Sequence, residues 1–204
     1  MTHRKPDLAY ERALWAGGYR AIAGVDEAGR GALAGPVAVA AVILPVECDA
    51  ACLPGVRDSK QMSAAQRACW AERIEAVAVG WAVGYASAAE IDRWGIVPAI
   101  HQALRRALAA LWPQPDFLLL DYLRLPDEPW PQAALVRGDQ RALSIAAASV
   151  LAKTHRDALM AGLEARYPGY GFGQHKGYGT RGHRQALRRL GPSAVHRRSF
   201  RLLG

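Results

Sequence analysis

The sequence predicts one α/β domain, in which a central sheet is flanked by helices. Three observations support this fold class: the chain has 204 residues, 51% of them are hydrophobic, and apolar runs of strand length alternate with stripes of helical period. No internal repeat or low-complexity linker interrupts the pattern. We therefore expect an N-terminal extension over residues 1–20 and one domain over residues 21–204, with a basic C-terminal subregion at about 165–204.

The domain is expected to begin with a β-hairpin. Residues 21–26 form an apolar run that ends in an acid, and residues 37–44 form a near-continuous apolar run suited to a central strand. The glycines at 29 and 31 permit the chain to bend between the two runs.

The later elements follow from period and capping signals. Ser63 with Gln66 three residues on is a capping-box pattern that predicts the start of a helix. Apolar residues spaced by three and four over 100–111 predict an amphipathic helix that stops before Pro113. The remaining elements are strands at 81–86, 117–120 and 133–136, a long helix of small residues at 144–163, and a basic helix around 185–190.

The positive charge of the chain is concentrated at one end. The formal net charge is +8, and nine Lys and Arg but no acid follow Glu164, so the first 164 residues sum to about −1. A basic subregion joined to an acid-bearing body is typical of a protein that holds a polyanion beside a catalytic or metal-binding site. The alternative interpretation is a solvated basic helix.

Apolar runs and cysteines bear on the cellular compartment. No run of eighteen apolar residues is present and residues 1–10 are polar, so we expect a cytoplasmic protein without a membrane segment. The sequence leaves the oligomeric state open, and a monomer is the default expectation. Cys48, Cys52 and Cys69 are odd in number and lack C-x-x-C spacing. We expect reduced structural thiols, and neither a disulfide framework nor a zinc site.

Acids stand at or just after the ends of three predicted strands. Asp26 ends the first strand, Asp121 ends the fourth and Asp139 follows the fifth. Strand ends at one edge of a sheet can converge, and Glu27 would bring the set to four carboxylates. That number suits two Mg²⁺ or Mn²⁺ ions on either side of a scissile phosphodiester. Taken singly, each acid could equally be a helix cap or a turn residue.

The loop after the first acids combines flexibility with charge. Gly29 and Gly31 can adopt positive φ and let a ligand approach the main chain, and Arg30 adds a cation beside two anions. This combination suits a metal ion and a phosphate together. In the alternative interpretation the segment is a polar turn in which Arg30 pairs with Glu27.

Three further positions are candidates for substrate contact. Tyr178 stands between glycines and follows Lys176, which suits stacking on a sugar or base with a phosphate contact alongside; the alternative is a plain loop aromatic. Lys60, in the loop triplet Asp-Ser-Lys, could reach a phosphate. Arg156 and Asp157 fall within a helical pattern and are expected either to be structural or to support the residues that contact the substrate.

Taken together, the motifs resemble bacterial type 2 ribonuclease H, ribonuclease HII, in order from about residue 21 to residue 200. They are DEAGRGALAGP at 26–36, DSK at 58–60, Asp121, Gly138 with Asp139, SIAAASVLAK at 144–153, Arg156 with Asp157, YPGYGFGQHKGYGT at 167–180 and HRRSF at 196–200. The resemblance implies an RNase H-like fold, a mixed central sheet flanked by helices, for the catalytic domain.

The resemblance also implies roles for individual residues. It makes Asp26, Glu27, Asp121 and Asp139 the catalytic, metal-binding carboxylates. It makes the loop of Gly29, Arg30 and Gly31 the reader of the ribose 2′-hydroxyl, the group that distinguishes RNA from DNA. Tyr178 would pack on the sugar that follows the ribonucleotide. The substrate-binding set is completed by Lys60, Lys176 and Thr180.

The activity implied by the resemblance is endonucleolytic. The expected substrates are the RNA strand of RNA/DNA hybrids and single ribonucleotides in duplex DNA, cut on their 5′ side with Mn²⁺ or Mg²⁺ to leave 3′-hydroxyl and 5′-phosphate ends. Arg30 favours type 2 over type 3, whose loop usually carries lysine; Thr154 and His155 depart from the family pattern outside the carboxylate set. The C-terminus shows no convincing glutamine-led peptide, so recruitment by a sliding clamp is not supported. The alternatives are a non-catalytic nucleic-acid binding module and a ribose-blind RNase H-like nuclease.

Overall fold

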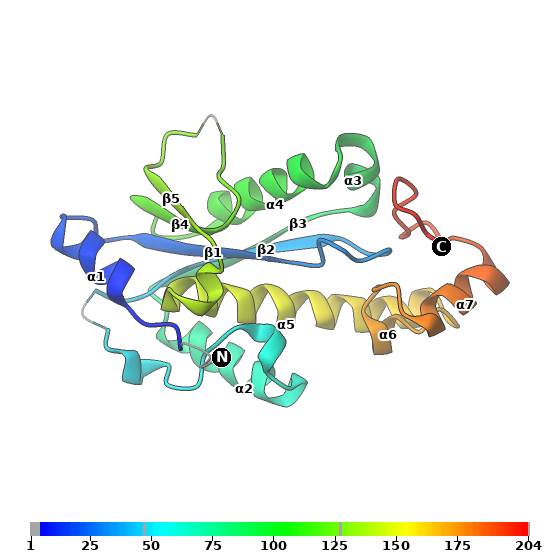
Figure 1. Cartoon of the computed structure of the whole chain (residues 1–204), viewed down its shortest axis with the longest axis horizontal. Helices are drawn as coiled ribbons and strands as arrows, with labels where there is room; N and C mark the ends of the chain where they lie inside the picture. The colour runs from blue at the N-terminus through cyan, green and yellow to red at the C-terminus, as the bar shows by residue number, and fades with distance from the viewer. Residues whose placement is uncertain (1–4, 47, 127, 204) are drawn as a thin grey trace.

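The centre of the molecule is a five-stranded mixed sheet in the order β3-β2-β1-β4-β5 (Figure 1). The computed structural model describes residues 5–46, 48–126 and 128–203. The first three strands form an antiparallel meander, and the last two are added parallel to β1, so the predicted hairpin and the predicted mixed sheet are confirmed. The strands are β1 (Ile22–Ala28), β2 (Val37–Ile43), β3 (Gly80–Ala86), β4 (Phe117–Asp121) and β5 (Gln132–Leu135).

Helices cover both faces of the sheet. In Figure 1, α3 and α4 lie on one face and α5, with α2 beyond it, on the other. α5 runs the length of the molecule, from the side of α1 to the side of α6 and α7. The helices are α1 (Ala9–Ala16), α2 (Ala64–Val77), α3 (Ala88–Trp94), α4 (Ile96–Ala110), α5 (Leu143–Arg166), α6 (Phe172–His175) and α7 (Arg181–Leu190). Three single 3-10 turns are η1 (Ala50–Cys52), η2 (Ser59–Gln61) and η3 (Gly138–Gln140).

Small residues allow α5 to lie directly on β1. Every residue of β2 is buried, as its continuous apolar run predicts for a central strand. At Gly24 a Cβ atom would stand 2.2 Å from the carbonyl carbon of Ser144, so only glycine permits this close approach of helix and strand. The alanines in the first half of α5 are buried and extend the same contact along the sheet: Ala146, Ala147, Ala148 and Ala152.

Several boundaries differ from prediction. β1 does not end at Asp26 but continues to Ala28, because β2 pairs with it as far as Ala28↔Ala38. α7 starts at Arg181, where the Thr180 side chain caps the helix by accepting from the N–H of His183 at 3.2 Å. α1, α3 and α6 were not predicted.

The residues before β1 are tied to the beginning of α5. The buried Glu11 carboxylate accepts from both the amide N–H of Ser144, at 2.8 Å, and its hydroxyl, at 2.6 Å. Asp7 forms an isolated parallel bridge with Ala142. The N-terminal segment is therefore held against the helix that supports the sheet. The division between an N-terminal extension and a domain that begins at residue 21 stays a prediction.

The expectation of three reduced cysteines is wrong for two of them. Cys48 and Cys52 form a disulfide, because the turn at η1 brings their Cα atoms to 6.5 Å, within the range a disulfide spans. Cys69 is free and exposed.

No helix within the described residues is both long enough and apolar enough to cross a membrane.

Candidate active site

Asp26 and Asp121 lie side by side on neighbouring parallel strands. β1 and β4 pair in register up to Val25↔Leu120, so each aspartate directly follows the last residue of its strand that pairs in this ladder. On their other edges, Asp26 pairs with Ala40 of β2 and Asp121 with Leu135 of β5. Alternate side chains of a strand share a face, and in both strands the aspartate falls on the face covered by α5. The convergence thus comes from the register of β1 and β4 and not from an end of β1.

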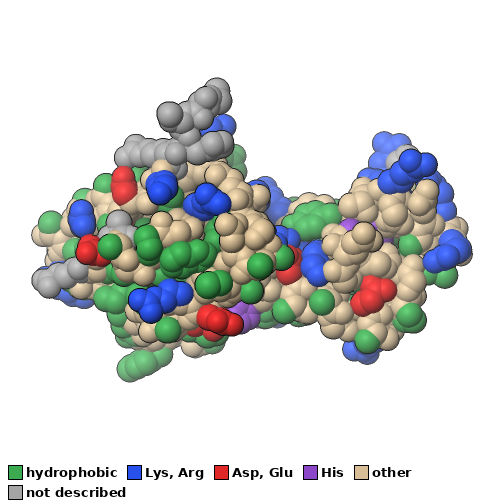
Figure 2. Space-filling view, turned by 90° about the horizontal axis from the view of Figure 1, so that it is seen from below, with side chains coloured by type: hydrophobic (Ala, Val, Ile, Leu, Met, Phe, Trp, Pro, Cys, Tyr) green, Lys and Arg blue, Asp and Glu red, His purple; other side chains and the backbone are tan. Residues whose placement is uncertain are grey.

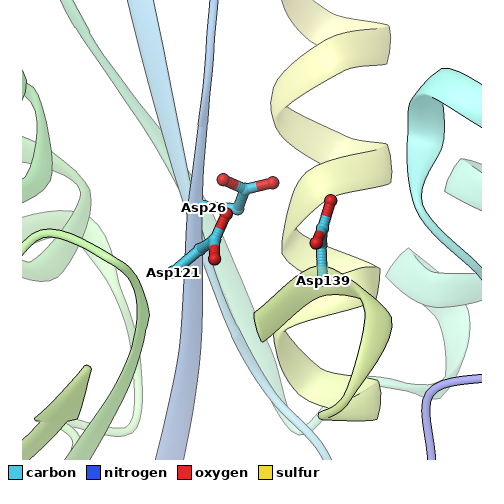
Figure 3. A group of neighbouring side chains, drawn as sticks. All are labelled: Asp26, Asp121 and Asp139. Atoms are coloured by element: carbon cyan, nitrogen blue, oxygen red, sulfur yellow. The ribbon is translucent and has the colours of Figure 1, made fainter. Parts of the chain in front are cut away.

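Asp139 reaches this pair from η3, the turn that precedes α5. The amide N–H of Gly138 donates to Oδ1 of Asp121 at 2.7 Å, which ties the turn to the end of β4. One ligand oxygen from each of Asp26, Asp121 and Asp139 lies within 4.8 Å of the other two (Figure 3). The structure therefore brings together three of the four predicted carboxylates.

Glu27 does not belong to this group of three. It follows Asp26 on β1, and successive side chains of a strand point to opposite faces. Its Oε1 lies 3.6 Å from Nη1 of Arg30, so the alternative pairing noted in the sequence is present. Glu27 nevertheless lines the same pocket as Asp26.

The aspartates carry unfavourable electrostatics in the metal-free protein. Burial raises the pKa of Asp26 well above its ordinary value, and the charges of Glu27 and Asp121 add to the effect. Burial, followed by the charges of Asp58 and Asp121, raises the pKa of Asp139 to about 6. Burial also raises the pKa of Asp121. Buried like charges at this spacing need a cation or a proton to relieve them.

Lys60 is close enough to the aspartates to respond to their charges. Burial lowers the pKa of its ammonium, but the charges of Asp26, Asp58 and Asp139 outweigh this and raise it above the ordinary value. Asp58 fixes the turn that carries Lys60: its Oδ1 accepts from the amide N–H of Lys60 at 2.9 Å, and its Oδ2 accepts from Gln140 at 3.3 Å. η2 and η3 are thereby joined across the site.

A pocket of about 290 Å³ lies beside the carboxylates. It is lined by Asp26, Glu27, Ala28, Gly29, Arg30, Gly31, Ser59, Lys60, Ser149, Lys153 and Tyr178. The three loop residues predicted to read the ribose, together with Lys60 and Tyr178, therefore share one cavity with two of the predicted carboxylates.

The two loop glycines differ in backbone conformation and in packing. Gly29 has φ of 88°, and a Cβ there would stand 1.9 Å from Nε of Arg156, so its conformation and its packing both require glycine. Gly31 lies outside the positive-φ set, and nothing lies within 4 Å of the place its Cβ would take. The prediction of positive φ is confirmed for Gly29 and wrong for Gly31.

Tyr178 is half-buried and its ring is bordered by cations. Lys153 Nζ lies 5.3 Å and Arg156 Cζ 5.5 Å from the ring centroid. Lys176 and Thr180 do not line the pocket. The Lys176 ammonium donates to the carbonyl of Gly173, and the Thr180 hydroxyl caps α7. The structure thus gives these two residues local contacts rather than a place at the pocket.

Sequence reasoning did not single out Ser149 and Lys153, which line the pocket from α5. The Ser149 hydroxyl donates to the Ser59 hydroxyl at 2.8 Å, and Lys153 Nζ pairs with Asp157 at 2.6 Å. The available signal was their spacing: Ser149, Lys153 and Asp157 recur every four residues, which places three polar side chains on one face of the helix. Asp157 also pairs with Arg67, at 3.4 Å, so it holds Lys153 and Arg67 together behind the pocket.

The donor set fits a hard divalent cation. Three carboxylates from three different elements present oxygen ligands within 4.8 Å of one another, and burial is the main cause that raises the pKa of each. Carboxylate oxygens are the ligands preferred by Mg²⁺ and Mn²⁺, and neither a thiolate nor an imidazole belongs to the group.

Comparison with solved structures identifies the fold. The ribonuclease H2 of Pyrococcus horikoshii superposes with a TM-score of 0.72 at 23% identity, covering 89% of this chain and 94% of that one. The ribonuclease HII of Archaeoglobus fulgidus, solved in complex with PCNA, gives a TM-score of 0.73 at 24% identity over 90% and 95% of the two chains. The chain therefore has the RNase H-like fold.

Sequence comparison identifies the family. The model of the family described as ribonuclease HII matches residues 23–203, so the chain belongs to the ribonuclease HII family. The ribonuclease HII of Synechococcus sp. (strain JA-3-3Ab) is 55% identical over 96% of this chain and 88% of its own length. That of Roseiflexus castenholzii is 54% identical over 100% of this chain and 92% of its own. The chain is a ribonuclease H, an endonuclease that depends on divalent metal and hydrolyses phosphodiester bonds in RNA/DNA hybrids.

Proposed function

We propose that this ribonuclease H also incises duplex DNA on the 5′ side of a single embedded ribonucleotide. The observation that carries the proposal is the shared pocket, in which the Gly29–Gly31 loop and Tyr178 lie next to Asp26 and Glu27. A ribose 2′-hydroxyl both donates and accepts hydrogen bonds, and a glycine loop lets it approach main-chain N–H groups, which donate, and carbonyl oxygens, which accept. Tyr178 offers its ring to the following sugar.

In this proposal Asp26, Asp121 and Asp139, with Glu27 at the rim, hold two divalent ions, Mn²⁺ or Mg²⁺. When bound, the ions supply an activated water and neutralise charge on the leaving 3′ oxygen. Two-metal hydrolysis of this kind leaves 3′-hydroxyl and 5′-phosphate ends.

The protein's own groups orient the substrate in this proposal. Lys60 and Lys153 place two ammonium groups at the pocket, where they would meet backbone phosphates, and Arg30 would meet the strand at the rim. Since Lys176 and Thr180 have local partners, their part in substrate binding is to support the segment that carries Tyr178.

The exposed arginines of the C-terminal subregion would hold the duplex. Figure 2 shows Lys and Arg side chains gathered on the end of the molecule formed by this subregion. Neutralisation of several phosphates by this surface would give binding that weakens steeply with salt. We propose that one copy of the chain suffices for binding and cleavage.

The test uses end-labelled duplexes of one sequence: one with a single ribonucleotide, one all-DNA and one RNA/DNA hybrid, each with Mg²⁺, Mn²⁺ or EDTA. We expect one metal-dependent cut 5′ of the ribonucleotide and none in the all-DNA duplex. Cleavage of the all-DNA duplex would indicate a ribose-blind nuclease. Cleavage of the hybrid alone would contradict the proposed incision at single ribonucleotides.

A further inference from the structure

Two buried histidines of the C-terminal subregion have no part in the cleavage proposed above. His183 and His196 are 0% and 2% exposed, and their Nε2 atoms lie 3.0 Å apart. Neither lines the pocket of the candidate active site. Two imidazole nitrogens at this distance share a single hydrogen, so one ring must donate and the other must accept.

The neighbours of the pair decide which ring donates. The amide N–H of Ser193 donates to Nδ1 of His196 at 2.9 Å, so that nitrogen is an acceptor and the ring hydrogen of His196 lies on Nε2. His196 therefore donates to Nε2 of His183. His183 must then carry its own hydrogen on Nδ1, which lies 3.0 Å from the carbonyl oxygen of Tyr178.

The result is a one-way chain of hydrogen bonds from Ser193 through both imidazoles to the backbone of Tyr178. Both rings are neutral in this arrangement. Burial agrees with this, because it lowers the pKa of His183 below its ordinary value and, together with the nearby His183, lowers that of His196 to about 4. His175 stacks on His183 with ring centroids 4.3 Å apart, which holds the plane of the ring.

The segment that carries His196 also holds the glycine loop. His196 forms an antiparallel bridge with Ala34, five residues after Gly29. The next residue, the buried Arg197, donates from Nη1 to the carbonyl of Arg30 at 2.9 Å. Two consecutive residues of the C-terminal segment thus fix the backbones of the two substrate-reading elements, one at Tyr178 and one at Arg30.

We propose that His183 and His196 are positioning residues that set Tyr178 against the Gly29–Gly31 loop and thereby set the preference for an RNA–DNA junction. The inference rests on the proposed function, because it takes Tyr178 as the residue that meets the junction. A displacement of about 1 Å in a positioning group is enough to cost about 100-fold in rate. The effect is specific for substrates whose cleavage depends on Tyr178.

The test compares cleavage of two substrates by His183→Leu and His196→Leu. For each protein, kcat/KM is measured on a single-ribonucleotide duplex and on a continuous RNA/DNA hybrid, and the ratio of the two is reported. We expect the ratio to fall by about 10-fold in both variants. The matched control is His155→Leu, which removes a half-buried histidine that pairs with Glu75 on the far side of α5, and leaves the ratio unchanged.

A rescue variant separates positioning from simple packing. In His183→Asn the side-chain amide places an N–H near the position of Nδ1, so it can still donate to the Tyr178 carbonyl. We expect His183→Asn to keep the ratio within about threefold of the wild type. Equal losses on both substrates in the leucine variants, in step with thermal stability, would show a merely structural role and overturn the proposal.

Tyr178→Ala distinguishes failure of this inference from failure of the proposed function. If Tyr178→Ala lowers the ratio and the leucine variants do not, the positioning role is wrong and the proposed function stands. If Tyr178→Ala leaves the ratio unchanged, the proposed role of the tyrosine is wrong. Long-range ¹H–¹⁵N NMR on the wild-type protein provides a test independent of folding of the variants: we expect Nδ1–H on His183 and Nε2–H on His196, and the opposite tautomers would overturn the chain of bonds.

Discussion

The carboxylate site and the C-terminal subregion differ in what their buried charged groups are bonded to. At the site, Asp26, Asp121 and Asp139 face one another, and their raised pKa values record unrelieved repulsion and burial. In the subregion, the buried guanidinium of Arg197 donates to the carbonyls of Gly35 and Arg30, and the buried histidines are neutral. Burial and the charge of Arg156 lower the pKa of Arg197 to about 9, so buried charge is unfavourable in both regions. In the subregion backbone carbonyls bind this charge, whereas at the carboxylate site a bound cation would relieve it.

This contrast corrects a simple interpretation of the basic C-terminus. Its cations are not all available to a polyanion. Arg197 is buried, Lys176 donates to Gly173, and Arg184 donates to the carbonyls of Gly179 and Leu202. The exposed cations after Glu164 are Arg166, Arg181, Arg188, Arg189, Arg198 and Arg201.

The largest expected effect is at the carboxylate site. Asp121→Asn, and equally Asp26→Asn, should lower the cleavage rate by at least about 1,000-fold, because each removes a charged ligand from the metal-binding group. Binding of RNA/DNA hybrid, measured by fluorescence anisotropy, should remain within about threefold, since the exposed arginines are unchanged. The control is Asp49→Asn, at the cap of η1. Wild-type turnover by Asp121→Asn would show that this aspartate is not part of the active site.

The next effect concerns the stability of the junction between α5 and the loops. Arg156 is fully buried and donates to the carbonyls of Pro36, Lys176 and Ala34 at 2.8 to 3.1 Å. Arg156→Met leaves those carbonyls without a donor, so the free energy of unfolding should fall by about 3 kcal/mol in urea titration.

The exposed Arg188→Met serves as the matched control for Arg156→Met and should change stability by less than about 0.5 kcal/mol. If the two variants were equally stable, the buried arginine would not hold the loops together.

A smaller effect is expected at the aromatic that links the two regions. Tyr178→Ala should reduce cleavage at a single ribonucleotide by about 10-fold, as expected for the loss of one stacking contact. Its melting temperature should change little, since the ring is half-buried. Parallel losses of activity and melting temperature would instead assign Tyr178 to packing.

The smallest expected effect is an increase in stability, in the variant Asp139→Asn. Because burial and the charges of Asp58 and Asp121 raise the pKa of Asp139 to about 6, the folded protein binds this proton more tightly than the unfolded chain does. Stability of the metal-free protein is therefore lost as pH rises from about 4 to about 6, and stays lower above that range. Asp139→Asn should raise the melting temperature in EDTA at pH 8 by roughly 2 to 5 °C, and at pH 4 by nothing measurable.

Saturating Mn²⁺ should reverse the order of Asp139→Asn and wild type, since the metal stabilises only the protein that binds it well. A variant less stable than wild type in EDTA at pH 8 would show that the carboxylate is not strained.

Periodicity and local signals predicted the sheet and the long helices. The continuous apolar run of β2 and the spacing in α4 are each determined by residues within a few positions of one another. α3 was missed although Ser87 and Glu90 form the same kind of capping box as Ser63 and Gln66, because seven residues are too few for a period to be recognised. The short α1 depends on the tertiary bond between Glu11 and Ser144.

The candidate site was predictable in its membership and less so in its geometry. The acids Asp26, Asp121 and Asp139 were selected because they stand at or just after predicted strand ends. Asp26 in fact lies inside β1, and its approach to Asp121 comes from the pairing register of β1 and β4, which the sequence pattern does not give. That Glu27 pairs with Arg30, and that Lys176 and Thr180 bond within their own segment instead of lining the pocket, depends on side-chain partners that no local pattern encodes. The hydrogen-bond chain through the histidines is likewise not encoded locally. In it, His183 bonds to Tyr178, 5 residues earlier, through Nδ1 and to His196, 13 residues later, through Nε2.

The length of α5 has a consequence for how such a protein can change in evolution. Its 24 residues extend about 36 Å, with Ser149 and Lys153 at the pocket and Arg156 under Gly29. One residue inserted between Ser149 and Arg156 would rotate everything beyond it by about 100° and advance it by about 1.5 Å. The positions of the pocket residues and of Arg156 therefore depend on the number of residues between them. Viable relatives should tolerate exchange of residues in this helix but not insertion or deletion, and differences in chain length should occur in the surface connections.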